Sequence, residues 1–250
     1  MTPLIVIPAR MASTRLPGKP LADIGGAPMI VRVCQRAAEA AIGPVLVAAA
    51  EPEIAAAVKT AGFEAILTDP NLPSGSDRVW AAAEAYDPDG YYDVIVNLQG
   101  DMPTIAPATL SDVLSPLEDE DCAIATLAGE ITDPDERSDP NVVKAVLSFQ
   151  TSKTVARALY FTRTPTPYGP GPLWHHIGLY AYRRPALERF VKAAPSALEI
   201  RERLEQLRAL ELGLSIGCAV INGPPPNGVD TPSDLDQARA YYATYKEDFE

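Results

Sequence analysis

Short apolar runs alternate with amphipathic stretches through the first half of the chain. Residues 4–7, Leu-Ile-Val-Ile, predict a strand buried on both faces, and Pro8 ends it because proline offers no ladder donor. Residues 28–41 place their apolar side chains on one helical face. Further strands are predicted at 44–50, 64–67 and 94–96, and further helices at 52–61, 74–86 and 104–118. This alternation predicts an α/β fold with a mostly parallel central sheet and right-handed crossovers.

The second half changes pattern. After a predicted strand at 123–127 comes a loop rich in Asp, Pro and Glu at 129–141. Three strands at 142–149, 158–163 and 174–183 then follow without a long helix between them, which predicts antiparallel pairing. An amphipathic helix at 198–212, a strand at 215–222 and a helix capped by Thr231, with Pro232 and Asp234 in its first turn, complete the chain. We therefore expect one domain over 1–250 with a smaller antiparallel subdomain inserted at 130–200.

Composition limits the partners. The chain has 250 residues, 47% of them hydrophobic, and a net charge of -12, which argues against nucleic acid or an anionic membrane as partner. Without an 18-residue apolar run or a basic leader, we expect a cytoplasmic protein. The cysteines Cys34, Cys122 and Cys218 are odd in number, widely spaced and set in apolar segments, so buried free thiols are expected.

A cationic loop follows the first predicted strand. It carries Arg10, Arg15 and Lys19, and residues 1–22 contain no acid. Ligands of parallel sheets bind at the carboxyl ends of the strands, where such a loop suits a polyphosphate. The pattern alone leaves open that these cations are merely solvated. A P-loop is excluded because Ser13 stands at its first position and Pro20 follows Lys19, and no Gly-x-Gly-x-x-Gly occurs.

A candidate metal ligand follows the strand at 94–96. Gly100 allows close backbone approach, and Asp101 lies where a hard cation bridging phosphates needs an oxygen ligand. An aspartate that caps its own turn is the alternative. The cationic loop at the same edge of the sheet favours the metal.

Residues 7–21, Ile-Pro-Ala-Arg-x-x-Ser-x-Arg-Leu-Pro-Gly-Lys-Pro-Leu, closely resemble the N-terminal motif of sugar nucleotidyltransferases, above all the 3-deoxy-manno-octulosonate cytidylyltransferases. The resemblance continues in order through 74–78, 99–101, 158–163, 176–183, 204–208 and 228–235. It implies a three-layer Rossmann-like nucleotidyltransferase fold and a homodimer formed through the 130–200 region. It also implies transfer of CMP from CTP to 3-deoxy-D-manno-octulosonate (Kdo) for lipopolysaccharide synthesis.

The resemblance also implies roles for individual residues. Asp101 and Asp230 would hold Mg²⁺, which explains Asp230, a residue that helix capping leaves without a role. Catalysis would rest on Lys19, Arg10, Asp101 and Asp230. Nucleotide contacts would come from Pro8, Ala9, Arg10, Arg15, Lys19, Ser74, Gly75 and Gln99. The acid sugar would be positioned by Arg78, Gln99, Arg163, His176, Tyr180, Glu205 and Gln206.

The residue patterns leave alternatives open. The alternating face of 174–183 that carries His176 and Tyr180 also suits an aromatic interface, and the charges around Glu205 suit a solvated helix face. Two departures from the family pattern, Ala50 and Met102, remove a polar nucleotide contact and a carboxylate beside Asp101. The chain could therefore prefer a related acid, such as the 8-amino analogue of Kdo or a nonulosonic acid. It could also be a nucleotide-binding protein without catalysis.

Overall fold

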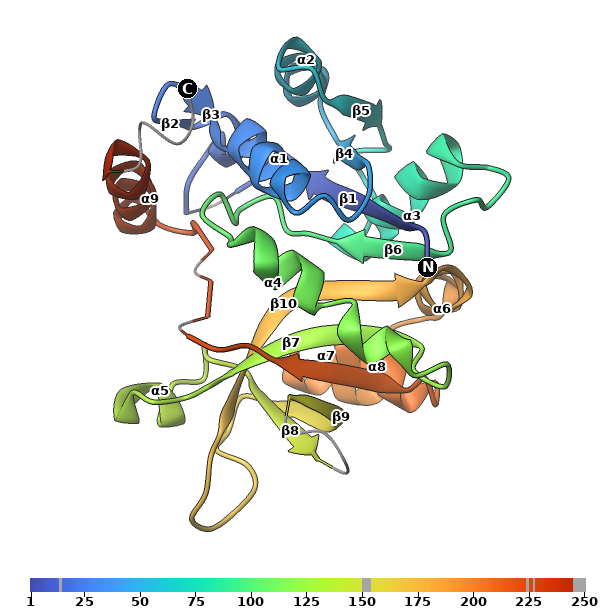
Figure 1. The fold of residues 1–250 in the computed structure, drawn as a ribbon, viewed down its shortest axis with the longest axis vertical. Helices are drawn as coiled ribbons and strands as arrows, with labels where there is room; N and C mark the ends of the chain where they lie inside the picture. Colours follow the sequence, from blue (N-terminus) through green and yellow to red (C-terminus); the bar gives the residue numbers. More distant parts are fainter. Residues whose placement is uncertain (14, 150–153, 224, 227, 245–250) are drawn as a thin grey trace. The chain divides into compact units, whose positions relative to one another are not determined.

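The computed structural model describes residues 1–13, 15–149, 154–223, 225–226 and 228–244, which form two compact units (Figure 1). The first unit comprises Met1–Leu110 and Pro226–Glu250, and the second comprises Ser111–Pro225. The predicted insertion at 130–200 falls within the second unit.

The first unit contains a parallel sheet with strands in the order β5-β4-β1-β6. Helices α1 and α2 pack together on one face, and α3 covers the other (Figure 1). The predicted α/β fold with a parallel sheet is confirmed here. The elements are β1 Pro3–Ala9, β2 Asp23–Ile24, β3 Ala27–Pro28, α1 Met29–Glu39, β4 Val45–Ala49, α2 Pro52–Thr60, β5 Glu64–Leu67, α3 Gly75–Tyr86, β6 Val94–Asn97 and α9 Pro232–Thr244.

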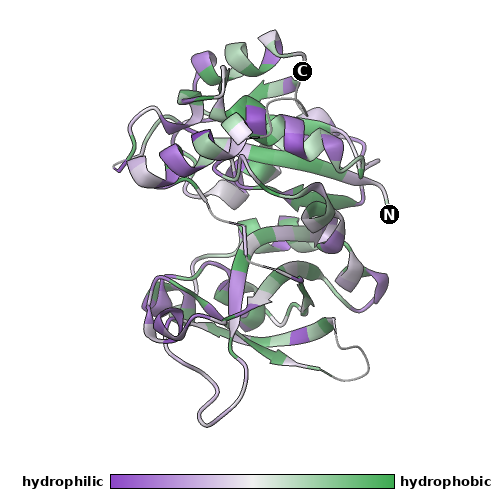
Figure 2. Ribbon diagram, turned by 60° about the vertical axis from the view of Figure 1, so that its left-hand side comes forward, coloured by the Kyte–Doolittle hydropathy of each residue, from purple (hydrophilic) through white to green (hydrophobic). Residues whose placement is uncertain are grey.

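The apolar runs form the core of this sheet. Leu4, Ile5, Val6 and Ile7 are all 0% exposed, as expected for a strand covered on both faces. Figure 2 shows strands that are mostly hydrophobic beneath helices of mixed character, which is the amphipathic pattern that the sequence predicted.

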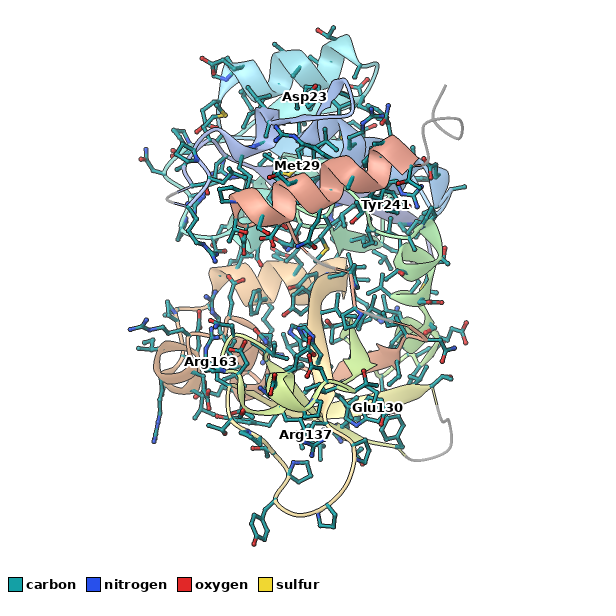
Figure 3. The ribbon with its side chains drawn as sticks, turned by 90° about the vertical axis from the view of Figure 1, so that its left-hand side faces the viewer. Asp23, Met29, Glu130, Arg137, Arg163 and Tyr241 are labelled. Carbon is teal, nitrogen blue, oxygen red and sulfur yellow. The ribbon has the colours of Figure 1, made fainter. Side chains whose placement is uncertain are left out.

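Helix α9 packs against the β2–β3 hairpin, whose turn uses Gly25 and Gly26 at φ 60° and 85°. Figure 3 shows Asp23, Met29 and Tyr241 beside this helix. Its side chain Tyr242 lies under the Arg32 guanidinium, 4.5 Å from ring centroid to Cζ, and donates to the carbonyl of Pro103 at 2.7 Å. The end of the chain is thereby fixed to the first half of the unit.

The second unit has strands in the order β10-β7-β11-β9-β8, and a further pairing of β8 with β10 closes the set. Only β7 and β11 are parallel among its described pairs, so the predicted change to antiparallel pairing is confirmed. Its elements, with α4 at the unit boundary, are α4 Pro107–Asp112, a 3-10 helix Ser115–Glu118, β7 Ile124–Glu130, α5 Pro134–Ser138, β8 Lys144–Ser148, β9 Val155–Thr162, β10 Trp174–Arg183, α6 Arg184–Lys192, α7 Ala197–Glu202, α8 Gln206–Glu211 and β11 Ile216–Val220.

Three predicted elements are wrong in detail. The helix at 198–212 is two helices, because Arg203 adopts a left-handed conformation at φ 56° and so ends α7. The helix at 104–118 ends at Asp112 and a 3-10 helix follows, with Pro116 in its first turn unable to donate to the preceding turn. The loop at 129–141 contains the short helix α5, whose N-cap Asp133 accepts from the amide of Asp135.

Candidate active site

A cavity of about 710 Å³ lies in the first unit, where β1 and β6 end. Its lining includes every residue that the sequence predicted for nucleotide or metal binding, together with Arg78. The full lining is Pro8, Ala9, Arg10, Ala12, Ser13, Arg15, Lys19, Pro20, Ser74, Gly75, Arg78, Gln99, Gly100, Asp101 and Asp230. The structure thus brings together segments that are up to 220 positions apart in the chain.

The ammonium of Lys19 lies between two carboxylates. It donates to Asp101 Oδ2 at 2.7 Å and to Asp230 Oδ1 at 3.0 Å, with its side chain only 14% exposed. Burial acts to lower the pKa of Lys19, but the two carboxylates outweigh burial and raise it. Arg15 donates to the other oxygen of Asp230 at 3.0 Å. Two cations therefore neutralise two carboxylates at the wall of the cavity.

Backbone contacts hold these groups in place. Lys19 begins a 3-10 helix behind Gly18, whose φ of 68° is one that glycine adopts readily. The loops that carry the two carboxylates are joined by a hydrogen bond from the amide of Val229 to the carbonyl of Asp101 at 2.8 Å. A side chain at Gly100 would place its Cβ 2.8 Å from the Pro8 carbonyl oxygen, so only glycine fits where these loops meet.

The start of α9 fixes Asp230. As predicted, Thr231 caps the helix: its hydroxyl accepts from the amide of Asp234 at 3.3 Å. In return Asp234 Oδ2 accepts from the amides of Asp230 and Thr231 at 3.0 and 2.8 Å. Helix α3 also begins as predicted, with Ser74 accepting from the amide of Asp77 at 3.2 Å.

Arg78, whose position near a helix N-terminus was unexplained, is held by a loop. Its guanidinium donates to the hydroxyl of Thr68 at 2.5 Å and to the carbonyls of Asp69 and Pro70 at 3.1 and 3.3 Å. Burial lowers its pKa, with the nearby charge of Glu51 acting in the opposite direction. Arg78 thus fixes the loop between β5 and α3 and also lines the cavity.

The sequence analysis missed Glu51. This residue follows β4, and its carboxylate accepts from the amide of Met11 at 3.0 Å, which fixes the start of the cationic loop. The available signal was an acid directly after a predicted strand that neighbours the cationic loop. Attention to the missing polar group at Ala50 obscured it.

The remaining predicted sugar contacts belong to the second unit. His176 and Tyr180 lie on one face of β10 with ring centroids 5.5 Å apart, and Phe161 packs against His176 at 4.8 Å. Gln206 is buried, and Glu205 lies close enough to help raise the pKa of Tyr180, although burial is the larger cause. The predicted solvated face here is wrong for Arg208, which is buried and pairs with Glu199.

Arg163, also in the second unit (Figure 3), is engaged with the backbone. It donates to the carbonyls of Pro140 at 2.8 Å, Glu202 at 2.9 Å and Arg203 at 3.3 Å. These contacts stabilise the end of α7 and the left-handed turn after it. A contact with a sugar stays a prediction for this residue.

Several sequence expectations about the rest of the molecule can be compared with the structure. The three cysteines are free and buried, as predicted. Met102 is 7% exposed and belongs to the core, so its side chain packs inward beside Asp101. None of the helices that the structure describes combines the length and apolar character needed to cross a bilayer.

A parallel α/β sheet whose carboxyl edge presents cations for phosphate beside two carboxylates is typical of nucleotidyltransferases. The cytidylyltransferase family model matches residues 4–216, and the chain belongs to this family. Two relatives are named 3-deoxy-manno-octulosonate cytidylyltransferase. The one from Parvibaculum lavamentivorans is 61% identical over 241 residues, covering 96% of this chain and 93% of the relative. The one from Xanthobacter autotrophicus is 62% identical over 240 residues, with coverage of 96% and 93%.

A solved structure agrees. It is CMP:2-keto-3-deoxy-manno-octonic acid synthetase complexed with CTP, which is 37% identical to this chain with a TM-score of 0.88. The match covers 98% of this chain and 99% of that one. The fold predicted for nucleotidyltransferases is therefore confirmed.

Proposed function

We propose that this protein transfers CMP from CTP to the anomeric hydroxyl of Kdo, releasing pyrophosphate, and so supplies CMP-Kdo for lipopolysaccharide synthesis. The observation that carries the proposal is the cavity in which Lys19 lies between Asp101 and Asp230. The names of relatives about 60% identical to the chain and the CTP complex of the similar solved structure support the choice of substrates.

In this proposal the cationic loop binds the triphosphate. Arg10, Arg15 and Lys19 neutralise the phosphate oxygens and stabilise the charge that develops on the α-phosphoryl group and the leaving pyrophosphate. Pro8, Ala9, Ser74, Gly75 and Gln99 line the same cavity and contact the nucleotide. Such a reaction needs positioning and charge neutralisation more than covalent catalysis.

The two carboxylates fit a divalent cation. Both already converge on one positive charge, the Lys19 ammonium, and carboxylate oxygens are the ligands that Mg²⁺ prefers. The described residues hold no group of three or more His, Cys, Asp or Glu side chains suited to a metal, so phosphate oxygens and water must complete the coordination. When bound, Mg²⁺ bridges phosphate oxygens and lowers the pKa of the attacking hydroxyl. We assign Asp101 and Asp230 to hold it.

The acid sugar is assigned to residues of each unit separately. In the first, Arg78 and Gln99 border the cavity. In the second, Arg163, His176, Tyr180, Glu205 and Gln206 stay predicted contacts, and so do the homodimer and the cytoplasmic location. An 8-amino analogue of Kdo or a nonulosonic acid is the alternative substrate.

The experiment that tests the function identifies the product. Purified protein is incubated with CTP, Mg²⁺ and each acid sugar in turn, and the nucleotide sugars are identified by mass spectrometry. CMP-Kdo as the main product supports the proposal, whereas a CMP conjugate of another sugar assigns the alternative. CTP binding with no conjugate from any sugar would mean that the chain has no transferase activity.

A further inference from the structure

Thr126 is fully buried at the centre of β7, inside a run of apolar residues. Its hydroxyl oxygen lies 2.9 Å from the carbonyl oxygen of Leu179, 3.1 Å from that of Ile177 and 3.1 Å from Nε2 of His176. The pairing of β10 with β7 shifts register between Ile177 and Tyr180, which places both carbonyls against this one side chain.

The hydroxyl has a single proton, and the two carbonyls can only accept hydrogen bonds. If that proton pointed to Nε2, two carbonyl oxygens would face the Thr126 oxygen at about 3 Å with no hydrogen between them, which is repulsive. The favourable arrangement gives the proton to the carbonyls and leaves the Thr126 oxygen as an acceptor. His176 must then donate through Nε2–H.

This donation decides what the rest of the imidazole can do. A neutral ring protonated at Nε2 carries a lone pair on Nδ1. Among the described residues Nδ1 of His176 has no hydrogen-bond partner, whereas Nε2 has one. Burial lowers the pKa of His176 to about 3, so the ring is neutral at physiological pH.

We propose that Thr126 is a positioning residue that holds His176 as the Nε2–H tautomer, so that Nδ1 accepts a hydrogen bond from a sugar hydroxyl. This inference rests on the proposed function, because it places His176 against the acid sugar. It goes further by excluding the sugar carboxylate as the partner of His176, since an acceptor nitrogen repels it. The neighbouring Tyr180, whose pKa is raised by burial, stays a neutral phenol and adds no charge to this wall.

The tautomer can be measured directly. The chain has two histidines, so long-range ¹H–¹⁵N spectra of the labelled protein contain two imidazoles, which His175→Gln assigns. We expect an Nε2–H ring for His176 in the unmodified protein and a changed proton position in Thr126→Val. Thr126→Ser keeps the hydroxyl and should keep the tautomer. An Nδ1–H ring in the unmodified protein, or an unchanged spectrum in Thr126→Val, overturns the inference.

Kinetics supply the second measurement. In Thr126→Val, KM for the acid sugar should rise about tenfold, as expected for one lost hydrogen bond, while KM for CTP stays constant. Thr109→Val, which alters another buried threonine, is the control and should change neither. An unchanged sugar KM in Thr126→Val contradicts the positioning role. If His176→Phe leaves sugar KM unchanged, the proposed sugar contact fails, and the spectrum still decides the tautomer.

Discussion

Lys19 donates a 2.7 Å hydrogen bond to Asp101, and the same ammonium reaches Asp230 at 3.0 Å. In the proposed reaction the two carboxylates hold a divalent cation, so this ammonium occupies the position of the charge that the substrate complex brings. A triphosphate offers Lys19 new partners and leaves the carboxylates for the metal. Nucleotide and metal should consequently bind together.

Metal binding provides the first prediction. Mn²⁺, followed by electron paramagnetic resonance, should bind weakly to the protein alone and much more tightly with CTP. In Lys19→Met the carboxylates lose their internal cation, so Mn²⁺ affinity without nucleotide should rise about tenfold. Lys59→Met, at an exposed lysine of α2, is the matched control and should behave as the unmodified protein. Equal affinity in the Lys19 and Lys59 variants would contradict the competition.

Turnover of the same Lys19→Met variant is the second prediction. Loss of a cation that stabilises transition-state charge should lower kcat about 100- to 1000-fold. The free energy of unfolding should change by less than about 2 kcal/mol, because the remaining carboxylates are partly exposed and Arg15 still pairs with Asp230. Turnover and urea unfolding measured on one preparation separate the two effects. A kcat within threefold of normal would remove Lys19 from the catalytic residues.

Glu51 is the third prediction. Its carboxylate accepts from the Met11 amide, so Glu51→Ala should loosen the start of the cationic loop and raise KM for CTP about tenfold. Glu53→Ala changes an exposed acid two positions later and should have no effect. Steady-state kinetics at varied CTP distinguish them, and similar KM values for the two variants would show that Glu51 does not position the loop.

The buried pair of Glu199 with Arg208 predicts the response to acid. Burial raises the pKa of Glu199, but its hydrogen bonds from Arg208 and Ser196 outweigh burial and lower it. A carboxyl with a lowered native pKa stabilises the fold above its ordinary pKa, and that stability is lost as the pH falls through the lowered value. Unfolding free energy should therefore decrease below about pH 4.5.

The variant Glu199→Gln isolates this contribution. At neutral pH it should cost about 3–5 kcal/mol, because Arg208 is left buried without its charge partner. Its stability should also depend less on pH in the acidic range than that of the unmodified protein. Urea unfolding followed from neutral to acidic pH measures both, and parallel pH profiles for the two proteins would exclude the pair as a source of acid sensitivity.

Local patterns predicted much of the fold. The apolar run at 4–7 and the capping residues Ser74 and Thr231 lie in the expected elements, because each depends on neighbours a few positions away. The break at Arg203 was not predictable from the helix pattern. It is stabilised by Arg163, which is 40 positions away and donates to two carbonyls of the turn.

The candidate site divides in the same way. Cations and carboxylates at strand ends predicted the lining of the cavity, since parallel strands deliver their carboxyl ends to one edge. Thr126 could not be found by that logic. It lies within an apolar strand, and only the shifted register of β10 gives its hydroxyl a function.

Pyrophosphate release from CTP, followed with Mg²⁺ and with or without Kdo, tests the central claim most directly. The protein should release pyrophosphate only when Kdo and the metal are both present, and Asp101→Asn and Asp230→Asn should each reduce the rate about 100-fold or more. Release without Kdo, or near-normal rates in both aspartate variants, would contradict the assignment of this cavity as a metal-dependent cytidylyltransferase site.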